Sequence, residues 1–242
     1  MRTPAVTITT SWDDGHRLDT RLAGLLTRYD LPGTFYIAPH NVELAPHDRL
    51  TAIEVAELAE AFEIGGHTLN HLPLAGLPAR RAREEIRLGK QELENITGRP
   101  VTSFCYPLGR YGHRDVRLVA EAGFSLARTV TRGSLVVGDP LEMATTVNAY
   151  RHLVDGPLAL RLALGNPLRA ARYFFGWDAL AMRWFDRCLA SGGVFHLWGH
   201  SWEVDARRDW ARLERVLAHI SRVPGARYVT NGQLAEAPEA AR

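Results

Sequence analysis

The sequence contains only two cysteines among its 242 residues, Cys105 and Cys188. Two thiols are too few for the disulfide framework of a small secreted domain, and they lack the paired spacing of a structural zinc site. A reducing compartment fits this composition, so we expect a cytoplasmic protein. No stretch approaches the roughly 18 apolar residues of a transmembrane helix, and no apolar secretion signal follows Met1.

The sequence also lacks an excess of charge of either sign. Lysine and arginine total 29 and aspartate and glutamate 27, which gives a net charge of +2. So small an excess does not support a nucleic-acid-binding face. The 46% hydrophobic and 23% charged residues are typical of globular proteins and exclude disordered and fibrous classes. Because domains usually hold about 100–200 residues, we expect a single domain over residues 1–242.

Strand-like and helix-like segments alternate through most of the chain, which is the pattern of parallel strands joined by crossover helices. The sequence predicts helices over 18–29, 51–62, 78–98, 115–122 and 209–221, and strands over 5–12, 33–38, 65–67, 102–106, 125–130, 145–150, 193–200 and 226–230. Seven or eight parallel strands in about 250 residues indicate an α/β fold of the distorted (β/α) barrel type. An open doubly wound sheet is the alternative.

The segment over residues 152–190 interrupts this alternation. It is helix-like, rich in leucine and alanine, and contains five arginines: Arg161, Arg169, Arg172, Arg183 and Arg187. We expect a helical insertion or lid that covers the barrel with a solvated face. The alternatives are an oligomer surface, or an interfacial helix that makes peripheral contact with a lipid-linked substrate at anionic headgroups.

Polar side chains cluster where three of the predicted strands end. The first strand ends in Ser11-Trp12-Asp13-Asp14-Gly15, a second leads into His67-Thr68-Leu69-Asn70-His71, and a late strand ends in His196-Leu197-Trp198-Gly199-His200. In barrels of this class the working residues lie at the carboxyl ends of the strands. Two acids and up to four histidines are therefore expected to converge on one rim.

These residue types suit a catalytic metal site. Asp13 and Asp14 are adjacent on a strand and point in different directions, so one can bind a metal while the other transfers protons. His67 and His71 are four residues apart and would share a face if the segment is helical. One carboxylate and two imidazoles make a three-ligand set with open positions. The alternatives are a helix N-cap for the acids and ordinary surface histidines.

The three strand ends resemble the motifs of the polysaccharide deacetylase family, the NodB-homology or carbohydrate esterase family four group. The family's Thr-Phe-Asp-Asp-Gly motif is similar to Ser11–Gly15, and its paired histidines to His67-Thr68 and His71. Its third motif, Arg-x-Pro-Tyr-Gly, is similar to Cys105-Tyr106-Pro107-Leu108-Gly109. The resemblance runs in order from residue 5 to about residue 205.

The resemblance implies a hydrolase that removes an acetyl group from an N-acetylated sugar or glycan. Carried over to this sequence, Asp14, His67 and His71 would hold a divalent metal ion, with zinc the expected one. Asp13 would be the general base that takes a proton from the metal-bound water. A nearby cation is consistent with this assignment, because it keeps Asp13 ionised and makes the water acidic.

The resemblance also implies an oxyanion site and a general acid. The backbone N–H of Leu108 would complete the oxyanion site. The family places a histidine at the end of a late strand, and we favour His200 over His196 because it lies nearer the carboxyl end. His196 is alternatively a core histidine. The substrate-binding residues we expect are Tyr106, Pro107, Leu108, Trp198 and Arg128.

One departure from the family pattern concerns the residue that orients the base. Where the family has an arginine, this sequence has Cys105, which carries no positive charge. Arg128 or Arg110 can supply the missing guanidinium.

The departure motivates a second hypothesis, a catalytically silent carbohydrate-binding protein on the same fold. A third is an amidase of a non-sugar metabolite, because the same metal and base can hydrolyse other carbon–nitrogen bonds. The sequence predicts neither the substrate's size nor the oligomeric state.

Overall fold

A computed structural model describes residues 5–235 of the chain. Within that range eight strands form one sheet in which every strand pairing is parallel. The strands are β1 (Val6–Asp14), β2 (Thr34–Ile37), β3 (Glu63–Gly66), β4 (Ser103–Cys105), β5 (Leu126–Arg128), β6 (Val147–Asn148), β7 (Gly193–Gly199) and β8 (Arg227–Tyr228). Each lies within or close to a segment predicted as a strand, and β1 continues two residues further, through Asp13 and Asp14.

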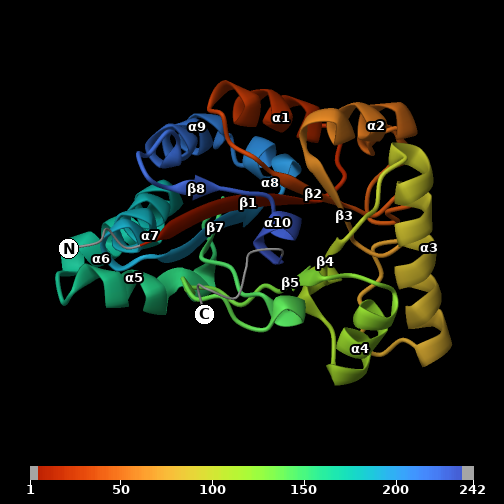
Figure 1. The fold of residues 1–242 in the computed structure, drawn as a ribbon. Coiled ribbons are helices and arrows are strands. Elements are labelled where there is room, and N and C mark those ends of the chain that lie inside the picture. Colours follow the sequence, from red (N-terminus) through yellow and green to blue (C-terminus); the bar gives the residue numbers. More distant parts are fainter. Residues whose placement is uncertain (1–4, 236–242) are drawn as a thin grey trace.

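The sheet curls into a distorted barrel, which confirms the predicted fold class. The strand order is β5-β4-β3-β2-β1-β7-β6, and β8 pairs with the first half of β1. The second half of β1 pairs with β2, from Ser11 opposite Thr34 to Asp14 opposite Ile37. Among the described residues β5 and β6 are not paired as strands, and a single bridge links Arg128 to Met143 near that gap. The helices form an outer layer around this curved sheet (Figure 1).

Five helices match the individually predicted segments, three more form the helix-like segment that begins at residue 152, and two short ones, over 201–206 and 231–235, were not predicted. The helices are α1 (Asp19–Arg28), α2 (Ala52–Ala61), α3 (Ala79–Thr97), α4 (His113–Glu121), α5 (Gly156–Ala163), α6 (Pro167–Phe175), α7 (Trp177–Ser191), α8 (Ser201–Ala206), α9 (Trp210–Ile220) and α10 (Asn231–Ala235). Thr51 and Glu54 form the capping box that starts α2. Gly98 ends α3 with a φ of 65°, a left-handed conformation that glycine adopts without strain.

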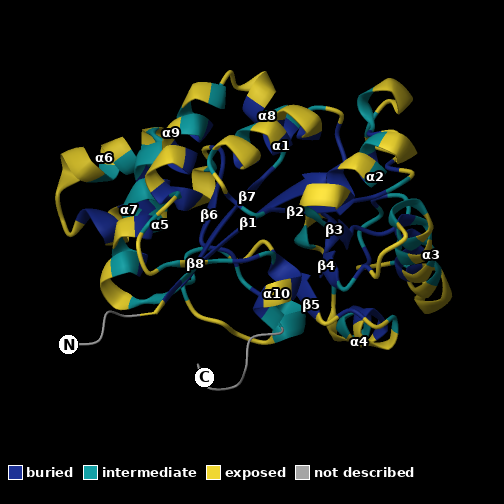
Figure 2. Ribbon diagram, turned by 45° about the horizontal axis from the view of Figure 1, so that its top comes forward, coloured by how far each residue is buried: buried dark blue, intermediate teal, exposed yellow. Residues whose placement is uncertain are grey.

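The core lies between the sheet and the surrounding helices. Trp12, Phe35, Phe104 and Phe195, one from each of four strands, are fully buried. Figure 2 shows the strands in the buried colour and the outward faces of the helices in the exposed colour. The central strand β1 is buried along most of its length although it carries the polar residues Thr9, Thr10 and Ser11 in its middle.

The segment over residues 152–190 forms a hairpin of two helices followed by a third helix. After a short 3-10 turn over Leu153–Asp155, α5 and α6 pack against each other as a hairpin, and α7 then leads into β7 and packs against it and α9. The hairpin is therefore the part of this segment that is additional to the strand–helix alternation. No helix described between residues 5 and 235 is long and apolar enough to cross a bilayer.

Candidate metal centre and active site

A cavity of about 500 Å³ opens where the carboxyl ends of β1, β3 and β7 meet. It brings together most of the residues that the sequence singled out. Its lining includes both acids, both spaced histidines and the last histidine of the late strand. The lining residues are Asp13, Asp14, Glu43, His67, His71, Tyr106, Leu108, Arg110, Val130, Arg132, Tyr150, His152, Trp198, His200, Trp202 and Glu203.

Asp14 lies at the centre of the candidate metal site. Its Oδ1 is 3.1 Å from Nε2 of His71 and 3.6 Å from Nε2 of His67. Its other oxygen, Oδ2, accepts a hydrogen bond of 2.8 Å from Nε1 of Trp202. The backbone of Asp14 has a φ of 88°, so the chain turns sharply at the end of β1. This turn separates the directions of the two neighbouring carboxylates.

The two histidines converge through a loop and not through a helix. Residues 67–71 follow β3 without helical structure, and both Thr68 and His71 have positive φ values, 62° and 64°. The helical geometry considered from their spacing is therefore wrong for this segment, although the ring centres still lie 4.8 Å apart. Buried Glu85 on α3 fixes the loop by accepting hydrogen bonds from the backbone N–H and side-chain amide of Asn70.

The outer nitrogen of each imidazole lies near a protein oxygen, and the inner nitrogen faces Asp14. Nδ1 of His67 lies 2.8 Å from the carbonyl oxygen of Cys105, and because a carbonyl only accepts, the proton lies on Nδ1. Nδ1 of His71 lies 2.8 Å from Oε2 of Glu43. Metal-binding histidines commonly have such an oxygen beside the ring nitrogen that faces away from the metal.

The donor set fits a divalent cation. Buried Oδ1 of Asp14 has no hydrogen-bond partner among the described residues. It meets two imidazole nitrogens, and the three ligand atoms lie within 4.8 Å of one another. Burial would raise the pKa of Asp14, but His200, His67 and His71 hold it well below its usual range. An ionised carboxylate beside two imidazoles is a typical zinc ligand set.

Asp13 lies beside this cluster in a different environment. Its Oδ2 accepts a hydrogen bond of 3.3 Å from the Cys105 thiol, and its buried Oδ1 has no partner in the described structure. Burial raises the pKa of Asp13, and the neighbouring His67 and His200 only partly oppose that rise. Burial and Asp13 in turn raise the pKa of Cys105 well above its usual range, so the thiol remains protonated and donates.

His200 follows β7 and immediately precedes α8. Its Nε2 is 3.8 Å from Oδ2 of Asp14, and its Nδ1 is 2.9 Å from Oε2 of Glu203. Burial lowers the pKa of this imidazole, but Asp14, Glu203 and Asp13 outweigh that effect and raise it to about 9. Glu203 therefore orients His200, whereas Asp205 accepts a hydrogen bond from Trp210.

The third motif forms a turn beside the cavity. Leu108 has a φ of 56°, is half exposed and lines the cavity. Tyr106 also lines it, but its ring stacks on Tyr111 at 4.0 Å and its hydroxyl donates to the carbonyl of Leu141. Pro107 is buried in the same turn and does not line the cavity.

Two further residues expected in the site also lie outside the cavity. His196 is buried in the core, with Nδ1 2.8 Å from Oγ1 of Thr145 and Nε2 3.1 Å from Oγ of Ser11. Arg128 is also buried, and its guanidinium donates to the side chain of Asn231 and the carbonyl of Ala144. Neither residue lines the cavity, and no hydrogen bond joins Arg128 to Asp13 in the described structure.

Other cavity residues were not found from the sequence. Glu43, Arg132 and His152 come from loops that show no motif or periodicity, and Tyr150 lies at the end of the segment predicted as a strand over 145–150. Trp202 lies on α8, and its hydrogen bond to Asp14 requires α8 to lie next to the end of β1. Tertiary contacts of this kind leave no local signal in the sequence.

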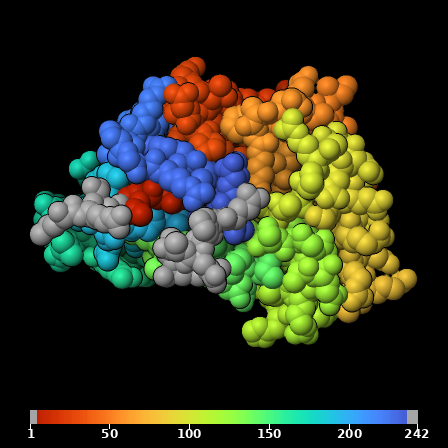
Figure 3. Space-filling model, in the orientation of Figure 1, coloured from red at the N-terminus to blue at the C-terminus, as the bar shows by residue number. Residues whose placement is uncertain are grey.

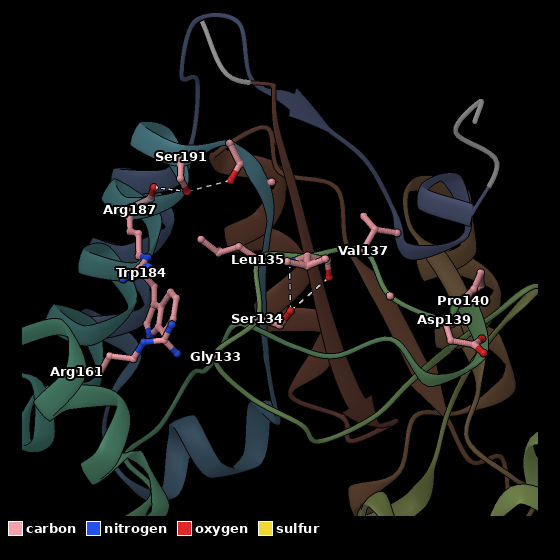
Figure 4. Close-up of a pocket in the computed structure, with 14 residues that line it drawn as sticks. Gly133, Ser134, Leu135, Val137, Asp139, Pro140, Arg161, Trp184, Arg187 and Ser191 are labelled. Carbon is pink, nitrogen blue, oxygen red and sulfur yellow. Dashed lines mark hydrogen bonds between the residues drawn. The ribbon is translucent and has the colours of Figure 1, made fainter. Parts of the chain in front are cut away.

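A larger cavity, of about 980 Å³, lies near the amino end of β7. Figure 4 shows Arg161, Trp184 and Arg187 gathered on one wall, with Asp139 and Pro140 on the far side. Apart from Asp139 its lining has no carboxylate, and it has no histidine. Since acid–base and metal chemistry require such groups, the smaller cavity is the candidate site.

Comparison with known proteins agrees with this geometry. The family model described as polysaccharide deacetylase matches residues 1–127. YxkH of Bacillus subtilis (strain 168), whose name assigns it to the polysaccharide deacetylases, is 25% identical over 126 residues, which cover 51% of this chain and 44% of YxkH. This chain thus matches less than half the length of that curated relative.

Solved structures share the fold at low sequence identity. A Mycobacterium smegmatis protein assigned to the polysaccharide deacetylases has a TM-score of 0.70 at 19% identity, covering 97% of this chain and 90% of that one. BA3943 of Bacillus anthracis, described as a pseudoenzyme of carbohydrate esterase family four, has a TM-score of 0.56 at 14% identity, covering 97% and 66%. With over half of its residues matched by the family model, this chain belongs to the polysaccharide deacetylase family.

Proposed function

We propose that this protein is a divalent-metal-dependent hydrolase that removes the acetyl group from an N-acetylated sugar. The observation that carries the proposal is the convergence on Asp14 of two imidazole nitrogens, with Asp13 and His200 alongside. A metal cluster, a spare carboxylate and a separate imidazole are the groups that amide hydrolysis requires.

Asp14, His67 and His71 would hold the metal, and zinc is the expected ion. When bound, such an ion acts as a Lewis acid that polarises the amide carbonyl and makes a coordinated water acidic near neutral pH. Glu43 and the carbonyl of Cys105 keep the two imidazoles oriented, and Trp202 does the same for the carboxylate.

Asp13 is the proposed general base. Its unpartnered Oδ1 is available to take the proton of the attacking water. Because burial raises its pKa, this carboxylate is a stronger base than an exposed aspartate. The Cys105 thiol holds its other oxygen, so the cysteine takes part of the orienting role that an arginine has in the family motif.

His200 is the proposed general acid. With a pKa raised to about 9, its imidazole is protonated at neutral pH. It can therefore donate a proton to the amine nitrogen as the carbon–nitrogen bond breaks, so that the products are acetate and a free amine. Glu203 keeps the ring oriented by accepting from Nδ1.

The cavity offers groups that suit a sugar. Trp198 is nine-tenths buried and lines the cavity, so its indole ring offers an aromatic surface to a sugar. Tyr150 and Trp202 add aromatic surface on the same wall. Leu108, in the third-motif turn, is the proposed backbone donor to the oxygen that becomes negative.

A second candidate is a carbohydrate-binding protein without catalysis. Cys105 at the family's arginine position favours it, since a thiol gives one weak hydrogen bond where a guanidinium gives two charged ones. An amidase of a non-sugar metabolite would use the same groups on another substrate.

The test is acetate release from a panel of N-acetylated amino sugars and non-sugar amides, with the metal stripped and then restored. We expect release from at least one amino sugar, its loss on stripping and its recovery with zinc. The Asp13→Asn variant should keep the metal and lose about 10²- to 10⁴-fold in turnover. The matched control is Asp186→Asn on the outer surface of α7, where the carboxylate pairs only with His219.

The outcomes separate the three candidates. Binding of an amino sugar without acetate release by the zinc-loaded protein would identify the silent binder. Release only from non-sugar amides would identify the other amidase. Equal turnover of Asp13→Asn and wild type would remove Asp13 from the mechanism.

A further inference from the structure

The hairpin of α5 and α6 exposes an unusual amount of apolar surface. Half of the large hydrophobic side chains that the described structure exposes lie in residues 153–175: Leu153, Val154, Leu160, Leu164, Leu168 and Phe175. Leu168 is 82% and Leu164 76% exposed. Isolated exposed leucines are ordinary, but a concentration of this kind marks a contact surface.

The exposure does not come from a poorly formed helix. Asn166 caps α6 by accepting from the backbone N–H of Arg169, and Pro167 occupies the first turn. α5 buries Ala159, Leu162 and Ala163 against the rest of the protein, whereas no residue of α6 is fully buried. Figure 2 shows α6 in the exposed and intermediate colours along its length, and Figure 3 shows this segment at one edge of the molecule.

The same hairpin carries positive charge and no negative charge. Residues 156–177 contain Arg161, Arg169 and Arg172, all exposed, and no aspartate or glutamate. Exposed Arg151 adds a fourth guanidinium, which lies 5.7 Å from the ring centres of Phe174 and Phe175. The nearest preceding acid, Asp155, is buried and faces Arg132 at 3.5 Å.

This charge pattern argues against a second copy of the chain as the partner. A two-fold dimer places the same patch of each copy against the other, so these arginines would meet like charges with no acid on the hairpin to offset them. Exposed apolar side chains flanked by arginines instead complement a partner with an apolar interior and anionic groups at its boundary with water. A bilayer containing anionic lipids has that composition.

We propose that the α5–α6 hairpin docks this protein on the surface of an anionic lipid bilayer, with its leucines and Phe175 between the headgroups and its arginines on the lipid phosphates. Tyr150 and His152, which line the catalytic cavity, directly precede the hairpin. The docking itself does not depend on the proposed reaction.

The test is co-sedimentation of the whole protein with vesicles of phosphatidylcholine alone or of phosphatidylcholine with phosphatidylglycerol. We expect wild type to pellet with the anionic vesicles, with about tenfold weaker partitioning to the neutral ones and weaker binding at high salt. Leu164→Ser with Leu168→Ser, and separately Arg169→Gln with Arg172→Gln, should each reduce partitioning about tenfold.

Matched controls lie elsewhere on the surface. Ile53 on α2 is 72% exposed, and the side chain of Arg80 on α3 is 89% exposed. Ile53→Ser and Arg80→Gln should leave partitioning unchanged. Thermal unfolding of every variant verifies that it is folded, and acetate release is measured separately.

Several outcomes overturn the proposal. These are failure of wild type to pellet with anionic vesicles, equal pelleting of wild type and both hairpin variants, and equal binding to neutral and anionic vesicles. A second copy would be the partner instead if wild type bound no vesicles and formed a dimer in sedimentation velocity. The double variant Leu164→Ser with Leu168→Ser would then be a monomer.

Discussion

The two oxygens of Asp14 have different surroundings, and this difference decides what the residue can bind. Oδ2 is held by the indole N–H of Trp202, while Oδ1 faces the two imidazoles without a hydrogen-bond partner in the described structure. A carboxylate fixed at one oxygen cannot rotate away from its neighbours. The Trp202 hydrogen bond thus positions the ligand atom before any metal arrives.

We predict that Trp202→Phe weakens metal binding. The ring is kept but its donor is lost, and removal of a group that hydrogen-bonds to a metal ligand typically costs about 10- to 100-fold in metal affinity. Competition with a chromophoric chelator measures the dissociation constant. Trp210→Phe is the matched control, because Nε1 of Trp210 donates to Asp205, which does not line the cavity. Equal affinities for the two variants would show that the hydrogen bond does not position Asp14.

His196 gives a prediction about stability and pH. Burial and the nearby Arg128 lower its pKa well below the usual value. The folded protein therefore keeps this imidazole neutral, whereas the unfolded chain takes up a proton below its pKa of about 6.5. Above pH 6.5 the imidazole of His196 is neutral in both states, so its protonation does not change the free energy of unfolding. Below pH 6.5 the free energy of unfolding falls as the pH drops, by at most about 1.4 kcal/mol per pH unit.

The comparison of His196→Gln with wild type isolates this effect. We expect wild type to lose more stability than the variant between pH 7.5 and pH 5, measured by urea unfolding at each pH. His219→Gln is the control, since His219 lies near the surface and pairs with Asp186. A variant that loses as much stability as wild type over this range would show that His196 is not the acid-sensitive group.

At the scale of elements, α3 packs closely against the loop that carries His67 and His71. A Cβ built on Gly89 would lie 2.7 Å from the backbone carbon of Thr68 and 2.8 Å from the backbone nitrogen of Leu69. Backbone atoms cannot move aside as a side chain can. Glycine at position 89 therefore allows the helix to approach the loop that carries both histidines.

We predict that Gly89→Ala displaces this loop, lowers metal affinity and destabilises the fold by about 1–3 kcal/mol, as overpacking does. Gly24→Ala on α1 is the matched control, because its Cβ would meet no atom within 4 Å. There alanine should stabilise the helix by roughly 0.5–1 kcal/mol. Unfolding curves and chelator competition measure both quantities, and equal behaviour of the two variants would contradict the packing argument.

The elements were predictable because their signals are local. Thr51 with Glu54 starts α2, and Gly98 ends α3, as the sequence indicates. The convergence of the strand ends followed from fold class alone. The geometry of the loop over residues 67–71 could not be predicted. Thr68 and His71 have positive φ values, and the loop is held by contacts with Gly89 and Glu85, which are 15 residues or more away along the chain. The burial of Arg128 could not be predicted either, because its hydrogen-bond partner Asn231 is 103 residues away along the chain.

At the scale of the whole molecule, the site joins segments that are distant along the chain. Asp14 ends β1, His67 and His71 follow β3, and Trp202 comes from α8 after β7. The ligand atoms meet only when these parts of the barrel are assembled. The unfolded chain cannot offer the same three-ligand geometry, so a metal should bind the folded state preferentially.

This linkage predicts that metal binding stabilises the entire domain. At a free zinc concentration about 100 times the dissociation constant, the expected gain is about 2.7 kcal/mol, or roughly 5–10 °C in Tm for a chain of this size. Asp14→Asn should abolish the shift because it removes the central charged ligand, whereas Asp186→Asn on the surface of α7 should keep it. Calorimetry with and without chelator measures both. If Asp14→Asn retained the full shift, the stabilising metal would be bound elsewhere, and the three residues around Oδ1 of Asp14 would not form the metal centre.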